Sequence, residues 1–185
     1  IHKVEDFFQA AELAKTFGFS AINMDLIVGL PGEGRREFLH SLSDVLALGP
    51  ENITVHTLAI KRGSKFGMEN AHSFASSGEA EAMLAEGAER LAGAGYAPYY
   101  LYRQKYMAGN LENVGYALPG KESIYNIDIM EEAASILAFG AGAISKKVSG
   151  GVVKIRRAPA IKDVPKYIQR IEQMIERKRE LFGQE

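Results

Sequence analysis

A strand, a glycine-rich turn, a helix and a second strand follow one another between residues 21 and 59, and this succession limits the possible folds more than any other feature. Ala21–Val28 is too short and too rich in β-branched residues for a helix. Arg35–Leu48 has the length of a helix, ends at Gly49, and leads into a second strand over Ile53–Ala59. Strands joined by a helix are typical of a parallel sheet, so the sequence predicts an α/β fold.

The first of these strands has two different faces. Met24, Leu26 and Val28 alternate on one side, whereas Asn23 and Asp25 point to the other. A carboxylate in the middle of an apolar strand is costly unless it is paired or solvated inside a cavity. Asp25 is therefore expected to meet either a ligand with a hydroxyl or ammonium group or a partner on a neighbouring strand.

The flanking sequence predicts further elements. The expected elements are a helix over residues 4–17, a long loop over 61–77, a helix over Glu79–Ala94, a strand over Tyr96–Arg103 and a loop over Lys105–Ser123. Then follow a short strand over Ile124–Ile129, a short helix over Met130–Phe139, a hairpin turning at Ser149-Gly150, and a helix capped by Asp163 that buries Ile168, Ile171, Ile175 and Phe182. The composition change after residue 60 predicts a boundary between residues 1–60 and 61–185.

Composition excludes several classes of protein. The 185 residues include no cysteine, and four histidines lie scattered without ligand spacing, so no metal site is expected within the chain. A net charge of −1 gives no general attraction to nucleic acid. No stretch has the length and apolarity of a membrane span, and no signal peptide is visible, so a cytoplasmic protein is expected.

Two other segments bear on whether the chain binds a ligand. Gly29–Gly34 is not a phosphate-binding P-loop, because Arg35 and Arg36 stand where a lysine and a hydroxyl residue are needed. Tyr99–Arg103 combines aromatic rings with a guanidinium, which suits a large, flat, polyanionic ligand. Aromatic residues buried in a strand would explain the same pattern.

Several motifs, in order and spacing, resemble one known family. They are Asp25-Leu-Ile-Val-Gly-Leu-Pro-Gly32, Tyr99–Tyr106, Gly109–Tyr116 and Leu137–Ser145. Together they are similar to the radical S-adenosylmethionine enzymes related to oxygen-independent coproporphyrinogen III oxidase. The resemblance implies the last strands and helices of a partial (β/α)6 radical-SAM barrel over residues 1–60. An α+β C-terminal subdomain over residues 61–185 would then cover the active site.

The resemblance also implies roles for individual residues. Asp25 would contact S-adenosylmethionine, Ala59 would line its adenine side, and Ile144 would close over it. The family's three cysteines, which bind a [4Fe–4S] cluster, are expected in an upstream segment that this chain lacks. On charge and position alone, Arg103, Lys105 and Lys121 are candidates for holding the propionates of a tetrapyrrole substrate.

In the intact enzyme the resemblance implies a radical oxidative decarboxylation. Two propionates of coproporphyrinogen III would become vinyl groups, giving protoporphyrinogen IX, with an electron donor as a further partner. This chain alone is expected to be inactive. Three alternatives remain: a haem-binding chaperone of the same scaffold, another radical enzyme of the family, or an isolated α/β binding module. The chaperone is disfavoured because Asn110–Tyr116 departs from its His-Asn-x-x-Tyr-Trp segment and the chain has no tryptophan.

Overall fold

The computed structural model describes residues 2–59, 75–103, 111–150 and 154–183. They form two compact units, Ile1–Ile124 and Tyr125–Glu185. The boundary expected at residue 60 separates two parallel strands from two antiparallel strands that continue the same sheet. As a division between a barrel and a covering subdomain, that boundary stays a prediction.

The first unit is built on a four-stranded sheet in the order β1-β2-β4-β3. The strands are β1 (Asn23–Val28), β2 (Asn52–Thr57), β3 (Ala97–Tyr102) and β4 (Asn113–Ala117). β1 and β2 are parallel, with Asn23 opposite Asn52 and Val28 opposite Thr57, while β4 runs antiparallel to both β2 and β3. The predicted parallel pair is confirmed, and with it the α/β class.

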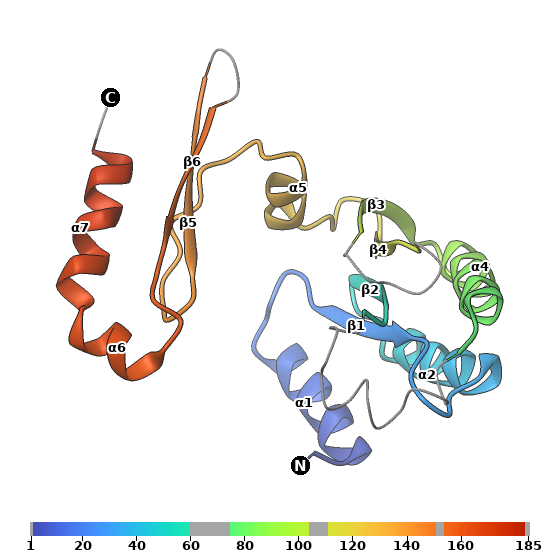
Figure 1. Cartoon of the computed structure of the whole chain (residues 1–185). Coiled ribbons are helices and arrows are strands. Elements are labelled where there is room, and N and C mark those ends of the chain that lie inside the picture. The colour runs from blue at the N-terminus through green and yellow to red at the C-terminus, as the bar shows by residue number, and fades with distance from the viewer. Residues whose placement is uncertain (1, 60–74, 104–110, 151–153, 184–185) are drawn as a thin grey trace. The chain divides into compact units, whose positions relative to one another are not determined.

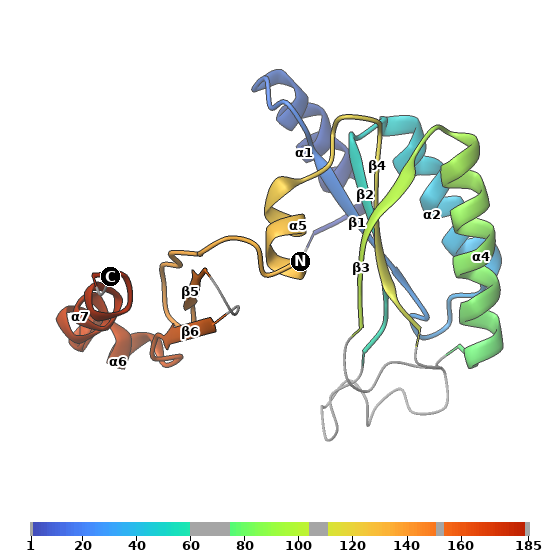
Figure 2. The same cartoon turned by 90° about the horizontal axis from the view of Figure 1, so that it is seen from above.

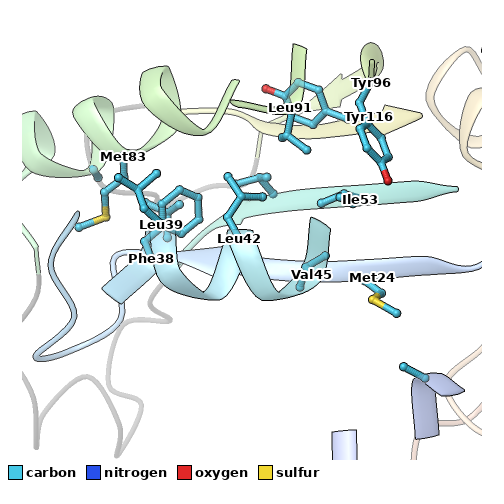
Figure 3. Packing of buried hydrophobic residues seen from close by; sticks show 14 residues of the cluster. Met24, Phe38, Leu39, Leu42, Val45, Ile53, Met83, Leu91, Tyr96 and Tyr116 are labelled. Atoms are coloured by element: carbon cyan, nitrogen blue, oxygen red, sulfur yellow. The ribbon is translucent and has the colours of Figure 1, made fainter. Parts of the chain in front are cut away.

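Two helices pack against one face of this sheet, as Figure 2 shows. They are α2 (Arg35–Leu48) and α4 (Ser77–Gly93), whereas α1 (Val4–Thr16) precedes β1. Between helices and sheet lies the core, to which Phe38 and Leu42 of α2 and Met83 and Leu91 of α4 contribute side chains that are at most 2% exposed (Figure 3). Burial of such side chains is the main stabilising contribution to this unit.

Local sequence signals set the ends of both helices. The backbone N–H of Gly34 donates to the Glu37 carboxylate at the start of α2, and Gly49 ends that helix with a φ of +63°. Ser76 caps α4, because its hydroxyl accepts from the N–H of Glu79 at 3.2 Å. The predicted bounds of α2 are confirmed to the residue.

Two expectations for the first unit are wrong or lie outside what the structure describes. The stretch after residue 105 was expected to be a loop because of its glycines and proline, but β4 lies there between β2 and β3. Pairing on both sides satisfies its backbone and outweighs the low strand propensity of glycine. The predicted loop at 61–77 falls mostly outside the described residues.

Residues 124–185 contain shorter elements (Figure 1). They are α5 (Ile124–Met130), β5 (Ile144–Ser149), β6 (Lys154–Pro159), α6 (Val164–Gln169) and α7 (Ile171–Phe182). β5 and β6 form the expected antiparallel hairpin, and α7 packs beside it. Asp163 caps α6 as predicted, accepting from the Lys166 N–H at 3.0 Å.

Three details of this unit differ from the sequence expectations. Residues 124–129 are helical rather than extended, and 131–139 contain turns and a bridge from Ile136 to Lys146 in place of a helix. The hairpin pairs Ser149 with Lys154, so the predicted two-residue turn at Ser149-Gly150 is wrong. For residues 124–139, apolar content did not distinguish a strand from a helix, because short segments of both kinds can be equally apolar.

The predicted buried stripe of the last helix is also wrong. Ile168 is 66% exposed, and Ile171 and Ile175 are 38% and 36% exposed, whereas Met174 and Leu181 are buried. The helix is interrupted at Arg170, so residues before and after that point do not follow one helical phase. Within the described part of the chain, no helix is both long and apolar enough to cross a membrane.

Candidate functional site

The sheet face opposite α2 and α4 carries a connected set of polar side chains, here called the polar face. Its members come from three strands: Asn23 and Asp25 of β1, Thr54 and His56 of β2, and Tyr100 and Tyr102 of β3. Because side chains alternate along a strand, every second residue of β1 and β2 reaches this face. Hydrogen bonds and one ion-pair contact connect all six side chains.

Asp25 lies on the polar face with a partner for each carboxylate oxygen. The Asn23 side-chain amide donates to Oδ1 at 2.6 Å, and His56 Nε2 lies 3.4 Å from Oδ2. The His56 hydrogen bond, more than any other influence, lowers the pKa of Asp25, while partial burial acts in the opposite direction. The side chain is nevertheless 56% exposed, so the carboxylate is ionised, anchored and accessible.

Of the two expectations for Asp25, the partner on a neighbouring strand is present, namely His56 of β2. The contact with a ligand stays a prediction. An ionised carboxylate is a pure acceptor, so it can bind hydroxyl or ammonium donors of a ligand.

His56 connects Asp25 to the tyrosines. Its Nδ1 lies 3.2 Å from the Tyr102 hydroxyl, and the two rings meet edge to face with centroids 6.3 Å apart. Tyr102 in turn lies parallel to Tyr100, with a 2° angle between the rings. The imidazole is thus held between a carboxylate and a phenol.

Tyr100 completes the network on the other side. Its hydroxyl lies 3.3 Å from Thr54 Oγ1, which donates to the Asn23 amide oxygen at 3.0 Å. Its ring lies against Gly115 of β4, where a Cβ atom would come within 1.8 Å of Tyr100 Cε1. Burial raises the pKa of Tyr100, so the phenol stays protonated at neutral pH.

The other predicted cofactor residues are not members of this network. Ala59 follows β2 and is half-buried. Ile144 belongs to β5 of the second unit, where it pairs with Pro159 and is 52% exposed. The contacts of these two residues do not indicate a role in cofactor binding.

The three predicted substrate residues differ in their surroundings. Arg103 pairs with Glu112, with Nη2 2.7 Å from Oε1, and the two residues line a cavity of about 370 Å³ together with α4 residues Leu84 and Ala85. The α4 side chains in this lining place the cavity on the helix side of the sheet, away from Asp25. Lys121 donates from Nζ to the Ser20 carbonyl at 3.0 Å. Lys105 lies outside the described residues.

Sequence reasoning did not single out Thr54 or His56, and it named Tyr100 and Tyr102 only as part of the segment Tyr99–Arg103, without linking them to Asp25. Alternation could have placed Thr54 and His56 on one side of their strand, but the register with β1 is not readable from sequence. For the tyrosines the signal is hidden by an irregularity, since the β3–β4 register shifts between Pro98 and Tyr100. No group of three or more histidine and carboxylate side chains suited to a metal ion occurs within the described residues.

Comparisons with known proteins give a consistent result. No family model matches the chain. The chain is 47% identical over 179 residues to the oxygen-independent coproporphyrinogen-III oxidase-like protein HemZ of Bacillus subtilis, covering 96% of this chain and 36% of that protein. It is 39% identical over 62 residues to the oxygen-independent coproporphyrinogen III oxidase of Helicobacter pylori, covering 32% and 14% respectively.

The heme chaperone HemW of Escherichia coli is a more distant relative, 26% identical over 146 residues that cover 79% of this chain and 35% of the chaperone. Among solved structures, the coproporphyrinogen III oxidase HemN of Escherichia coli, a radical SAM enzyme, matches with a TM-score of 0.62 at 20% identity. That match covers 94% of this chain and 39% of HemN.

The chain thus spans only about a third of the length of HemZ, with 36% covered. The match to HemN extends over nearly all described elements and shows a shared fold. The chain therefore belongs to the oxygen-independent coproporphyrinogen III oxidase family and corresponds to a C-terminal portion of its members.

Proposed function

We propose that the polar face forms part of an S-adenosylmethionine site in a cytoplasmic enzyme that oxidatively decarboxylates coproporphyrinogen III. In this proposal β1 and β2 are the last strands of a partial (β/α)6 barrel, and residues 61–185 cover its active site. The observation that carries the proposal is Asp25, an exposed carboxylate anchored by Asn23 and His56 at the middle of a parallel strand.

The residues of the polar face suit the nucleoside part of S-adenosylmethionine. Asp25 offers acceptor lone pairs for hydroxyl donors, and Ala59, at the carboxyl end of β2, offers a small apolar surface for a base. Ligands of parallel α/β sheets bind at the carboxyl ends of the strands. A [4Fe–4S] cluster does not fit this chain, because no cysteine is present to bind it.

Cofactor and cluster, when bound, would supply the hydrogen-abstracting radical, as in other enzymes where the cofactor carries the difficult step. This chain's own residues would orient the cofactor and shield it from water. Asp25 would hold the cofactor, and Ile144 would exclude water from above. Overall, a propionate would become a vinyl group by losing CO₂, one hydrogen atom, which the radical would take up, and one further electron, which an external acceptor would take up.

Arg103, Lys105 and Lys121 remain our candidates for holding substrate propionates. Arg103 now pairs with Glu112, and Lys121 with the Ser20 carbonyl, so each would exchange its present partner for a carboxylate. Arg103→Ala in the full-length protein should raise the KM for the tetrapyrrole. An unchanged KM would remove Arg103 from the site.

The test of the proposal is Asp25→Asn in the full-length protein with its cluster reconstituted. Loss of a charge-assisted hydrogen bond should weaken S-adenosylhomocysteine binding by about tenfold or more, measured by calorimetry. Asp44→Asn is the matched control, because Asp44 is a carboxylate beside a histidine on the surface of α2. Equal affinities in all three proteins would contradict the proposal.

A haem chaperone is the second candidate, favoured by the match to HemW over 79% of the chain. Titration of the full-length protein with haem distinguishes the two. Tight stoichiometric haem binding without formation of a decarboxylated product would favour the chaperone.

A further inference from the structure

We infer that Tyr102 and His56 are positioning residues, which form a directional hydrogen-bond chain that orients Asp25 toward its ligand. The inference deepens the proposed function and rests on it for the ligand's identity. The chain runs from the Tyr102 hydroxyl through the imidazole to the carboxylate, across strands β3, β2 and β1.

The first step concerns the freedom of the Asp25 side chain. A carboxylate that is 56% exposed would ordinarily rotate among several orientations in water. Here each oxygen has a partner: the Asn23 amide holds Oδ1 from the same strand, and His56 Nε2 lies beside Oδ2 from β2. The hydrogen bond from Asn23 and the ion-pair contact with His56 restrict the carboxylate, and its exposed part remains available to a ligand.

The second step fixes the direction of the hydrogen bonds. An ionised carboxylate only accepts, so the His56 nitrogen nearest to it, Nε2, must carry a proton. In a neutral imidazole Nδ1 is then an acceptor, and the Tyr102 hydroxyl 3.2 Å away donates to it. Tyr102 therefore selects the histidine tautomer that binds Asp25.

The third step shows why Tyr102 stays in place. Its ring stacks on Tyr100 with an angle of 2° and a centroid distance of 6.3 Å. Tyr100 is itself confined between Thr54, which its hydroxyl meets at 3.3 Å, and the bare backbone of Gly115. His56 thus lies between Asp25 on one side and Tyr102 on the other.

Two substitutions of His56 distinguish a role in orienting Asp25 from a role in filling space. His56→Phe keeps a ring but removes the donor, whereas His56→Gln places an amide N–H near the position of Nε2. In the full-length protein, His56→Phe should weaken S-adenosylhomocysteine binding about fivefold to tenfold, the size of one hydrogen bond. His56→Gln should recover most of that loss, and Tyr102→Phe should show a smaller loss.

The matched control is His40→Gln. His40 on α2 also lies beside an aspartate, with Nε2 3.7 Å from Asp44 Oδ2, but it is far more exposed than His56. This control should bind as the unsubstituted protein does. If His56→Phe and His56→Gln bind equally well, or lose affinity equally, His56 does not position Asp25 and the inference is wrong.

A second measurement is independent of any ligand. Nitrogen-15 NMR of histidine-labelled, unsubstituted protein should show the Nε2–H tautomer for His56, and Tyr102→Phe should shift its Nδ1 signal. The Nδ1–H tautomer would overturn the inference. If the tautomer is as expected but Asp25→Asn does not affect S-adenosylhomocysteine binding, the proposed function fails while the hydrogen-bond chain stands.

Discussion

Strand geometry sets the position of the Asp25 side chain, and neighbouring polar groups set its pKa. Parity along β1 places it on the face opposite the core, and its neighbours on that face determine its chemistry. Met24, directly before Asp25, and Val28, three residues after it, are both buried. One strand thus contributes to the core and to the candidate site at the same time.

The pH dependence of Asp25 follows from its partner. Its pKa in the folded protein lies below the ordinary value, mainly because of the His56 hydrogen bond. The resulting stabilisation is therefore complete above the unfolded-state pKa and is lost as the pH falls through the lower, folded-state pKa. His56→Phe should move the pKa of Asp25 upward, as followed by carboxyl carbon-13 NMR, whereas His40→Gln should leave it in place. A downward shift in His56→Phe would contradict the assignment.

A buried phenol offers a stability test at the same scale. Tyr96 is 6% exposed, and its hydroxyl donates to the Pro50 carbonyl at 2.5 Å. Tyr96→Phe should lower the free energy of unfolding by about 1 kcal/mol, measured by urea denaturation, because the carbonyl loses its partner in a buried site. Tyr125→Phe is the control, since Tyr125 is 63% exposed and its loss should change little. Equal effects of the two changes would argue against the buried hydrogen bond.

The sequence revealed part of this site. Alternation of apolar and polar residues was enough to place Asp25 and Asn23 together away from the core. His56 could not be recognised, because a lone histidine in a strand has no distinctive spacing. Its meaning depends on the register that sets Ile27 opposite His56 and Asp25 opposite Thr54, and no local pattern specifies that register.

Among the elements, α2 and α4 approach each other closely at one glycine. A Cβ atom at Gly87 would lie 3.1 Å from Phe38 Cε1, which is tighter than ordinary packing. Gly87→Val should therefore lower the free energy of unfolding by about 1–3 kcal/mol through overpacking. Gly93→Ala in the same helix is the control, because a Cβ atom there would have no neighbour within 4 Å and alanine favours a helix. A stabilised Gly87→Val variant in thermal denaturation would show that the helices separate easily.

Prediction of elements succeeded where one pattern dominated and failed where tertiary contacts decided. α2 has clear signals at both ends, and its predicted bounds hold. β4 was hidden by glycine, although its pairing with β2 and β3 makes it an interior strand. In β3 the register shift after Pro98 determines which tyrosines reach the polar face, and alternation from Ala97 would have selected Tyr99 instead.

For the whole chain, the absence of cysteine limits which cofactors its own side chains can bind. With no cysteine in 185 residues, the chain has no thiolate ligands for an iron–sulfur cluster. After anaerobic reconstitution with iron and sulfide, residues 1–185 alone should show no thiolate-to-iron absorption and form no 5′-deoxyadenosine. The full-length protein, treated in parallel, should show both. A cluster on the isolated chain would require ligands of another kind.

For the whole chain, the sequence predicted the family and the fold class but not the arrangement of all the strands in the sheet. The strand–helix–strand succession was sufficient for a parallel α/β pair, and the motif order was sufficient for the family, which HemZ and HemN support. Strand β3 lies where a strand was predicted, but the antiparallel pairing of β4 with β2 and β3 could not be foreseen. The pairing of β2 with β4 joins residues about 60 positions apart, such as Ile53 and Tyr116, and it depends on the global fold.

The contact between Tyr100 and Gly115 has an evolutionary consequence. The aromatic ring occupies the space that any side chain at 115 would need, so the two positions cannot vary independently. Among relatives that keep this sheet, a larger residue in place of the glycine should be accompanied by a smaller one in place of the tyrosine. Lineages that retain both residues should also retain the stacked tyrosine pair, and with it the geometry around His56.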